Sequence, residues 1–357
     1  MTSLSDAPVQ FHIGLDVHSA HTTIHVLDTG GRCVHKTRIN DTPLRAAAEL
    51  IDWLDGRVAN VCFEASLGYV ALYAALAPCC RRVAVAHPGQ LRLIFRSKKK
   101  NDRADAEKLA KLLYLDQVPE AFVPPEEVRN WRKMIEVRSR TVGKRTRVKN
   151  ALQAILRSLS RQVPAEFGLW SRAGLAWLRT QSLPEAEALD RDLLLDELDL
   201  LDDQIRRLTK TLDALARRSP AITLLRTIPG VGPRTAEAVA AYIGTAKRFD
   251  SAKQVAAYFG LVPKQDQSGR SNRLGHISKE GPGTPRGLLI EASWQAIRRS
   301  ESLQARFDRI HGGKPDRRKI ALVAVAHHLV RVMYAMLRDN RPWSEAGPER
   351  KPASAAT

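Results

Sequence analysis

The sequence predicts a mixed α/β domain, then a helical region with a coiled-coil seam, then a mostly α-helical C-terminal domain. Short β-branched segments alternate with helical segments in the first third of the chain, as in mixed α/β folds. Near the middle, apolar residues recur at alternating intervals of four and three, as in a coiled coil. A Gly-x-Gly turn between two apolar segments marks the last domain. The expected boundaries are 1–125, 126–220 and 221–340, with a disordered tail at 341–357.

The first domain is expected to begin with strands and to continue with helices and strands in alternation. The turn Thr29-Gly30-Gly31 separates the second strand from the third, and Asn101 is a suitable N-cap for a helix. The predicted strands are 11–17, 22–28, about 32–38, 60–64 and 82–86, and the predicted helices are 42–54, 69–76 and 101–115.

The helical region begins with a strongly basic segment. Residues 128–161 hold eleven Lys or Arg and a single acid, Glu136. Such a helix can lay many cations along a phosphate backbone, although a solvated basic face without a partner has the same composition. The cations expected to bind nucleic acid are Arg138, Arg140, Lys144, Arg145, Arg147 and Lys149, together with Lys98, Lys99 and Lys100 upstream.

A heptad seam follows the basic segment. It comprises Leu194, Leu198, Leu201, Ile205, Leu208, Leu212 and Leu215. A narrow seam of this kind favours a coiled coil with another chain, while an amphipathic helix packed on its own chain is the alternative. The segment that leads into the seam is acidic, which makes contact between this helix and DNA unfavourable.

Gly230 and Gly232 lie in the turn Ile228-Pro229-Gly230-Val231-Gly232-Pro233, between two predicted helices. A glycine hairpin of this kind resembles the helix-hairpin-helix element, whose backbone N–H groups bind phosphate. A tight turn between two helices could need the same glycines for structural reasons alone. Residues 260–281 are predicted to form a loop or short hairpin, and helices are predicted at about 285–300 and 317–338.

Charge and composition limit the classes of function. The chain has 357 residues, 57 Lys plus Arg against 38 Asp plus Glu, a formal net charge of +19 and a pI of about 10.2. This balance indicates a polyanionic partner, usually nucleic acid, over a generic basic surface or an anionic membrane face. No stretch approaches the roughly 20 uninterrupted apolar residues of a membrane span, and residues 1–10 do not resemble a secretory signal. We therefore expect a soluble cytoplasmic protein with no membrane partner.

The four cysteines do not form a zinc pattern. None of them makes a C-x-x-C pair. Free thiols, buried or incidental, are the expected state. The residues are Cys33, Cys62, Cys79 and Cys80.

Four carboxylates lie where a metal site could form. Asp16 and Glu64 end predicted strands, and Asp102 and Asp105 are three residues apart, so they share one face of a predicted helix. Strand ends and a helical face can converge at one end of a sheet, and hard divalent cations need such oxygen ligands. Two cations there would stabilise the attacking and leaving oxygens of phosphoryl transfer. Two-metal nucleases of the ribonuclease H class place acids on this order of elements.

Each acid also has a purely structural interpretation. Asp16 and Glu64 could cap the turns or helices that follow them, and Asp102 could cap its own helix. Asp105 could pair with Lys108, three residues further along the same helical face.

Longer runs of sequence resemble one family. In the N-terminal third they are GLDVHSAHTTIHVLD, FEASLGY (63–69) and AVAHPGQLRLIFRSKKKNDRADAEKLAKLL (84–113); further on they are IPGVGPRTA (228–236), YFGLVPKQDQSG (258–269), GHISKEG (275–281) and KIALVAVAHHLVRVMYAML (319–337). Together they resemble the bacterial insertion-sequence transposase family numbered one-ten, with its eleven-eleven subgroup. The resemblance covers nearly the whole chain in the right order. It implies that the first domain is a ribonuclease H-like (RuvC-like) DEDD domain.

The resemblance implies the following site. The four family acids fall on Asp16, Glu64, Asp102 and Asp105, which would hold Mg²⁺ (or Mn²⁺). The sequence departs from the family pattern at Asn101, where Thr is usual, and at 65–68, where the family reads closer to A-T-G.

The family also carries a nucleophilic serine in its second domain, and here it falls on Ser268. Ser271 and Ser278 are nearby competitors. The implied reaction is strand cleavage through a 5′-phosphoserine link, followed by strand exchange and rejoining. Arg270, Arg273 and Lys279 could neutralise the phosphorane.

The resemblance further implies partners. A structured noncoding guide (bridge) RNA would pair with donor and target DNA, and the protein would assemble as a dimer or as a dimer of dimers. Such an enzyme is expected in the bacterial cytoplasm, associated with the nucleoid.

Three hypotheses of function remain open from sequence. The first is the RNA-guided transposase with serine and metal chemistry. The second is a metal-only RuvC-like junction nuclease that hydrolyses DNA with water, and the third is a non-catalytic architectural DNA-binding protein. Substitution of Ser268 separates the first from the second, and substitution of Asp102 tests the third.

Overall fold

The structure is a computed structural model that describes residues 7–66, 68–95, 102–268 and 271–345 of the chain. It divides into two units, Met1–Pro124 and Pro125–Thr357. Several residues singled out from sequence lie outside the described residues: Lys98, Lys99, Lys100, Asn101, Arg270 and the last twelve residues of the predicted tail.

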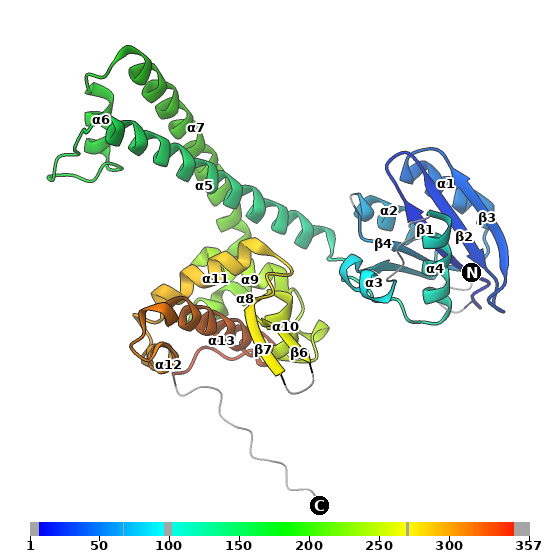
Figure 1. Cartoon of the computed structure of the whole chain (residues 1–357). Helices are drawn as coiled ribbons and strands as arrows, with labels where there is room; N and C mark the ends of the chain where they lie inside the picture. The colour runs from blue at the N-terminus through cyan, green and yellow to red at the C-terminus, as the bar shows by residue number, and fades with distance from the viewer. Residues whose placement is uncertain (1–6, 67, 96–101, 269–270, 346–357) are drawn as a thin grey trace, which may run out of the picture. The chain divides into compact units, whose positions relative to one another are not determined.

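The first unit is built on a mixed five-stranded sheet (Figure 1). Its strands are β1 (Phe11–Val17), β2 (Thr22–Leu27), β3 (Cys33–Ile39), β4 (Ala59–Glu64) and β5 (Arg82–Ala86), in the order β3-β2-β1-β4-β5. The first three strands run antiparallel, and β4 and β5 run parallel to β1. The α/β expectation for the start of the chain is confirmed.

Helices cover both faces of this sheet. The helices of this unit are α1 (Pro43–Leu54), α2 (Tyr69–Leu76), α3 (Pro88–Ile94) and α4 (Asp102–Tyr114). Ile13 and Leu15 point to the face where Leu50 and Leu72 of α1 and α2 complete one core. Because side chains alternate along a strand, Cys62 points to the opposite face, which α3 and α4 cover. Of these helices, sequence did not predict α3, which is only seven residues long.

Helix α4 crosses β1 at Gly14. A Cβ atom on Gly14 would lie 2.1 Å from the carbonyl oxygen of Ala106 and 2.4 Å from the amide nitrogen of Ala110. Both alanines are fully buried. Further along, the ring of Tyr114 lies 5.5 Å from that of His12. Residue numbers therefore rise along α4 as they fall along β1, so the two elements run antiparallel.

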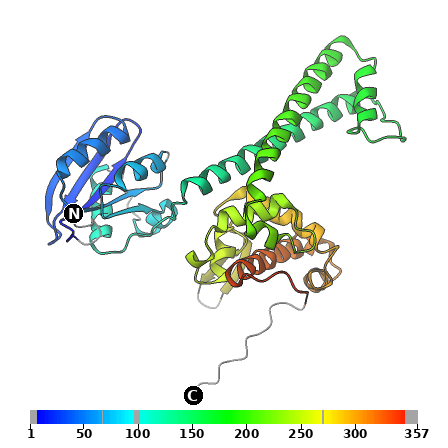
Figure 2. The ribbon, with the colours of Figure 1, turned by 180° about the vertical axis from the view of Figure 1, so that it is seen from behind.

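The second unit begins with a long helical hairpin (Figure 2). Helix α5 (Glu126–Ser158) and helix α7 (Glu185–Ala216) form its two arms, and α6 (Arg172–Thr180) lies at the far end. Leu195, Leu198 and Leu201 pack there against Leu152 and neighbouring apolar residues of α5. Of these three leucines, Leu198 and Leu201 belong to the predicted heptad seam. The favoured contact with another chain is wrong for these two, and the alternative, a helix packed on its own chain, holds for them. The repeat specifies which face of α7 is apolar, but not which chain covers it.

The rest of the second unit is a mostly helical body. Helix α13 (Arg318–Asp339) lies at its centre and packs against α10 (Ala252–Tyr258), α11 (Gly283–Ala296) and α12 (Glu301–His311). The same core includes Ile135 of α5 and Leu212 of α7, so the roots of the hairpin are part of this body. The remaining elements are α8 (Pro220–Leu225), α9 (Pro233–Ile243), the strands β6 (Pro263–Ser268) and β7 (Ser271–Ile277), and two 3-10 turns.

By length and hydropathy, one helical stretch in the described part of the chain, Pro315–Asp339, could span a membrane. It contains α13. Val325, Ala326 and Leu329 of that helix are fully buried in the core of the second unit. Its apolar composition is therefore explained by its central place in that core.

The four cysteines are free thiols, as expected from sequence. Cys62 and Cys80 are buried, and burial raises the pKa of each thiol to about 12. These two thiols are therefore protonated and unreactive at neutral pH.

The close crossing at Gly14 predicts the effect of adding one methyl group. Gly14→Ala pushes α4 away from β1, and we expect it to destabilise the first unit by about 1–3 kcal/mol, the usual cost of overpacking a core. Thermal or denaturant unfolding of the full chain measures this. Gly287→Ala on α11 is the control, because nothing lies within 4 Å of a Cβ there. Equal stability of the Gly14→Ala variant and the native chain would contradict the close crossing.

Candidate metal centre and nucleic-acid interface

Two of the four predicted acids lie side by side on neighbouring strands. The parallel pairing of β1 with β4 aligns Leu15 with Phe63, so Asp16 and Glu64 come next in the same register. Neighbouring strands are about 4.8 Å apart, and residues in register point to the same face. Asp16 and Glu64 also lie two residues beyond Gly14 and Cys62, whose face is the one covered by α4. Both acids are therefore on the α4 side, at the carboxyl ends of their strands.

The N-terminal end of α4 lies at this same edge. Since α4 runs antiparallel to β1 and its middle crosses Gly14, its first turn extends toward Asp16. Position 102 is four residues before Ala106, so the two lie on the same face of the helix. The Asp102 side chain is outside the described part of the structure. The fold thus brings all four predicted positions toward one edge of one sheet.

The described acids have local partners. Asp105 accepts a hydrogen bond from Lys108 Nζ at 2.8 Å, the pairing that the spacing alone allowed. Lys108 also lies over the ring of Phe95, 5.2 Å from its centroid. His18 Nε2 lies 3.2 Å from Asp16 Oδ2, and the imidazole of His18 stacks on that of His21. Glu64 is exposed.

The donor set fits a hard divalent cation, although the side chains are not gathered around one point. Among the side chains that the structure describes, no group of three or more His, Cys, Asp or Glu could hold a metal ion. Carboxylate oxygens on adjacent strand ends and on one helix are nevertheless the ligands that Mg²⁺ and Mn²⁺ prefer.

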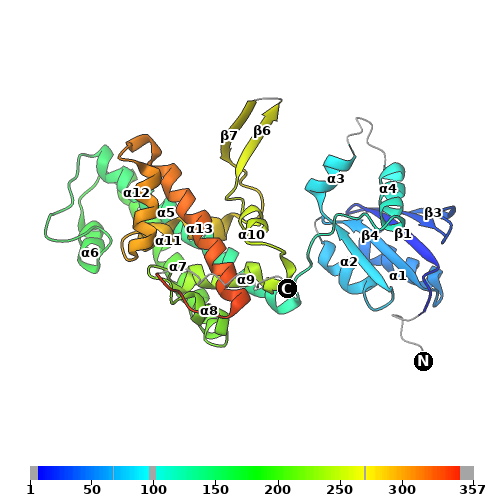
Figure 3. The ribbon, with the colours of Figure 1, turned by 90° about the horizontal axis from the view of Figure 1, so that it is seen from below.

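Ser268 is the last residue of β6, at the tip of a two-stranded hairpin. It pairs with Ser271, and β6 and β7 run antiparallel (Figure 3). The side chains of both serines are outside the described part of the structure. Of the two alternatives left open by sequence for this segment, loop and short hairpin, the structure shows the hairpin. It belongs to the second unit, whereas the four acids belong to the first.

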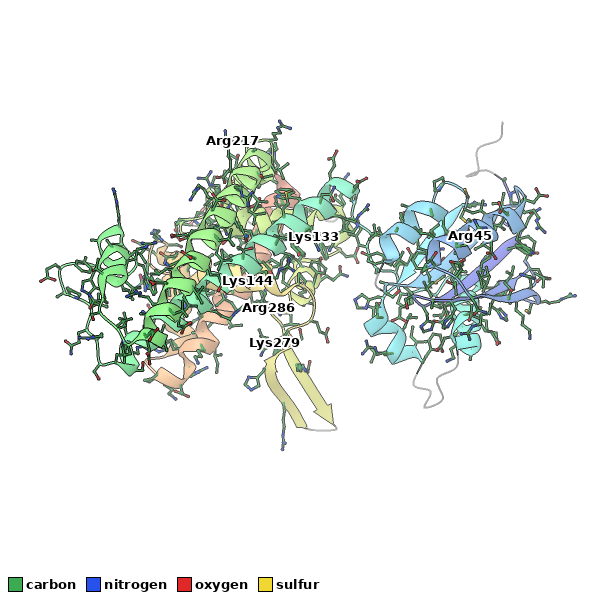
Figure 4. The ribbon with its side chains drawn as sticks, turned by 90° about the horizontal axis from the view of Figure 1, so that it is seen from above. Arg45, Lys133, Lys144, Arg217, Lys279 and Arg286 are labelled. Carbon is green, nitrogen blue, oxygen red and sulfur yellow. The ribbon has the colours of Figure 1, made fainter. Side chains whose placement is uncertain are left out.

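The base of this hairpin is fixed by backbone contacts. Ser278 N donates to Val262 O at 2.8 Å, and Lys279 N donates to Gly260 O at 3.2 Å. Arg286 Nη1 donates to the carbonyls of Phe259 (3.2 Å) and Glu280 (3.0 Å). Lys279 and Arg286 lie together at this base (Figure 4). Arg273 and Lys279 are exposed, which leaves both side chains accessible to a ligand.

The two glycines of the 228–233 turn have different surroundings. Gly230 has φ +84°, and a Cβ there would lie 2.5 Å from the backbone nitrogen of Ala296 on α11. Its requirement for glycine is therefore structural. Gly232 is the N-cap of α9, and nothing lies within 4 Å of a Cβ there. Of the two, Gly232 has the open surroundings that a phosphate would need.

The basic helix α5 divides its cations between two tasks. Arg138 Nε donates to Thr209 Oγ1 at 2.8 Å, Arg145 pairs with Asp202 at 3.0 Å, and Lys149 lies 4.7 Å from the ring centroid of Trp170. Burial, with Arg234 nearby, lowers the pKa of Arg138, and burial, with Arg145 nearby, lowers that of Lys149. These three predicted contacts to nucleic acid are held within the helical hairpin and its neighbours.

The other predicted cations of α5 form one exposed stripe. Arg140, Lys144 and Arg147 are exposed. Their spacings of four and three place them on one face of the helix. Lys133, a residue of the basic segment that sequence did not single out as a contact, is exposed on the same face seven residues before Arg140. Figure 4 labels Lys133 and Lys144 along α5. We call these four residues the α5 stripe; at 1.5 Å per residue it spans about 21 Å.

The single acid of the basic helix has a role that sequence did not reveal. Glu136 accepts hydrogen bonds from the hydroxyls of Tyr242 on α9 (2.6 Å) and Thr284 on α11 (2.7 Å). Five residues earlier, Trp131 Nε1 donates to the buried Glu237 of α9 at 2.9 Å. These contacts anchor the root of α5 in the helical body.

Comparison with known proteins identifies both halves of the chain. A family model described as "Transposase", for the DEDD domain of IS110, matches residues 13–160. A second, described as "Transposase IS116/IS110/IS902 family", matches residues 222–308. A Pseudomonas aeruginosa protein named "Probable family 20 transposase" is 32% identical over 251 residues, covering 67% of this chain and 72% of the relative.

Two further relatives belong to named insertion sequences. The transposase for IS1328 of Yersinia enterocolitica is 28% identical over 262 residues, covering 70% of this chain and 75% of the relative. The transposase for IS1111A of Coxiella burnetii is 29% identical over 209 residues, covering 56% of this chain and 55% of the relative.

The division of cations on α5 predicts two separable phenotypes. A plot of log affinity for duplex DNA against log salt falls with a negative slope. Replacing Arg140, Lys144 and Arg147 with Gln should make this slope shallower by about 2.7, since each phosphate contact contributes about 0.9 to its magnitude. The matched triple variant Arg138→Gln/Arg145→Gln/Lys149→Gln removes the same charge. It should instead lower the melting temperature and leave the slope nearly unchanged. Equal slope changes in both variants would show that α5 has no dedicated binding face.

Proposed function

The chain belongs to the IS110 family of transposases, enzymes that cleave and transfer DNA strands, and we propose that it does so by combining metal-bound carboxylates with a serine nucleophile. The observation that carries the metal half of the proposal is the placement of Asp16 and Glu64 on adjacent parallel strand ends, with the first turn of α4 directed to the same edge. Asp16, Glu64, Asp102 and Asp105 are the proposed ligands of Mg²⁺ or Mn²⁺.

When bound, the divalent cations polarise the phosphate and stabilise the attacking and leaving oxygens. In the proposed reaction, Ser268 Oγ attacks the phosphorus, the Oγ–P bond forms, and the bond between phosphorus and the 3′ oxygen breaks. The Ser268 hydroxyl loses its proton as it attacks, and the leaving 3′ oxygen takes up one, so the protons balance. A 3′ hydroxyl of another strand then attacks the phosphoserine and restores the serine, so no external energy source is needed.

The hairpin that carries Ser268 suits this role. Its base is held by Arg286 and by backbone contacts of Ser278 and Lys279, so the tip is presented from a fixed support. Arg273 and Lys279 are exposed on the same hairpin and its base, and can neutralise the charge of the reacting phosphate.

We further propose that a noncoding RNA of the insertion sequence guides the choice of DNA, as the sequence resemblance implies. The α5 stripe supports this proposal, because phosphate backbones of RNA and DNA are bound by the same exposed cations. The similarity to the transposase for IS1111A supports placement in the eleven-eleven subgroup. Such an enzyme would act in the bacterial cytoplasm, at the nucleoid.

The direct test is a covalent adduct. With labelled donor DNA, Mg²⁺ and the flanking RNA of the element, we expect a protein–DNA adduct that survives denaturation, is absent from Ser268→Ala and requires both the metal and the RNA. Asp105→Asn should abolish it, whereas Glu107→Gln should not. Glu107 is a matched control, since it lies on the same helix and pairs with Lys111 as Asp105 pairs with Lys108.

The alternatives predict other results in the same assay. Cleavage that persists in Ser268→Ala, with no adduct in the native protein, would support the metal-only junction nuclease. Native activity in Asp105→Asn and Asp102→Ala would support a non-catalytic role for the acids. Adduct formation without RNA would contradict guidance.

Self-assembly is also proposed, through the face of α7 that α5 leaves uncovered. Leu189, Leu193 and Leu200 are each more than half exposed, at 62%, 60% and 56%. Intervals of four and seven residues place them on one stripe, which is suited to a second copy of α7.

Replacing Leu189 and Leu193 with Gln should reduce the dimer or tetramer mass measured by sedimentation equilibrium. Leu44→Gln/Leu115→Gln, which changes two leucines of the first unit that are 51% and 57% exposed, should not. An unchanged mass in the α7 variant would rule out this face.

A further inference from the structure

A cluster of arginines and histidines lies where α12 packs against α13, outside every site described above. Its members are Arg306 and Arg309 on α12 and His327, His328 and Arg331 on α13. After burial, the neighbours that lower the pKa of Arg306 are Arg309 and Arg331. For His328, whose pKa falls to about 4, they are Arg306, Arg331 and His327. The groups that act on these two residues are therefore cations or imidazoles, and no acid is among them.

The nearby acids face elsewhere or have partners. Glu301 and Asp308 are exposed on α12, at about 220° and 200° around the helix from Arg306, so they lie on the opposite face. Glu345 lies near the first turn of α12, where it accepts hydrogen bonds from Ser300 Oγ (3.0 Å) and Ser302 Oγ (2.6 Å). Asp339 pairs with Arg338 at the far end of α13.

Arg331 adds a geometric observation to this cluster of charges. Its Nε atom is buried and has no hydrogen-bond partner among the described residues. A buried guanidinium nitrogen without an acceptor loses its hydration and gains nothing in return. Arg309 and Arg331 act on the half-buried Arg306 through like charge, and a bound anion would offset that repulsion.

We propose that Arg306, Arg309 and Arg331, with His327 and His328 beside them, form a binding site for backbone phosphates of duplex DNA. The planar guanidinium group binds phosphate oxygens through two parallel N–H donors, which an ammonium group cannot do. DNA is the partner, because the substrate of this family of enzymes is DNA and its phosphates repeat at a spacing that several arginines can follow. This site goes beyond the reaction proposed above and depends neither on Ser268 nor on an RNA guide.

The test measures DNA affinity of the full chain as a function of salt. Arg306→Gln/Arg309→Gln should make the negative slope of log affinity against log salt shallower by about 1.8. The matched control is Arg206→Gln/Arg207→Gln on α7. It removes the same charge from two exposed arginines that pair with Asp203 at 2.8 and 3.1 Å. This control should leave the slope unchanged.

Thermal stability separates a binding site from a structural one. Because the substitutions relieve repulsion, Arg306→Gln/Arg309→Gln should melt at the native temperature or above it while it binds DNA more weakly. The single variant Arg309→Gln, at an exposed position, should reduce the slope by about 0.9 without any effect on folding. An unchanged slope, an equal reduction in the control, or weaker binding to a structured RNA but not to duplex DNA would overturn the proposal.

Discussion

The close approach of the α4 backbone to Gly14 of β1 decides where the acids of the first unit can lie. Only a residue without a Cβ allows the helix to approach this strand so closely, and Ala106 and Ala110 keep the helix side equally small. The antiparallel direction of the crossing then places the first turn of α4 at the carboxyl ends of β1 and β4. Packing in the core therefore brings Asp16, Glu64 and the start of α4 together. The acids carry like charges, so attraction between them cannot be the cause.

Charge in the second unit is likewise organised by packing. A net charge of +19 alone indicates a polyanionic partner, but it does not show which cations are available to it. On α5, the cations that face α7 or Trp170 are held by Thr209, Asp202 and the indole ring. The cations on the opposite face remain in solvent. Glu136 completes the arrangement by fixing the root of the helix, so that the α5 stripe has a defined direction from the helical body.

Much of the fold could be predicted from sequence, because alternating apolar residues identify a strand whatever covers it. All five strands of the sheet were placed within one or two residues, as was α4. The short helices α3, α6, α10 and α12 were missed, although α2, which has eight residues, was predicted, because a helix of two or three turns shows a clear periodicity only in some sequences. The heptad seam of α7 was recognised, but its partner was not, because a repeat does not encode whether α5 or another chain will cover it. For the same reason, sequence could align Asp105 with Lys108 but could not show that Arg138 and Arg145 face inward.

The proposed reaction depends on one metal site that joins the ends of β1 and β4 to the first turn of α4. Replacing Mg²⁺ with Fe²⁺ in the full chain, adding ascorbate and peroxide, and mapping the cuts in the polypeptide by mass spectrometry tests it most directly. We expect cuts near residues 16, 64 and 102–105 together, all of them suppressed by excess Mg²⁺. Cuts confined to one of these segments, or cuts that Mg²⁺ does not suppress, would contradict it.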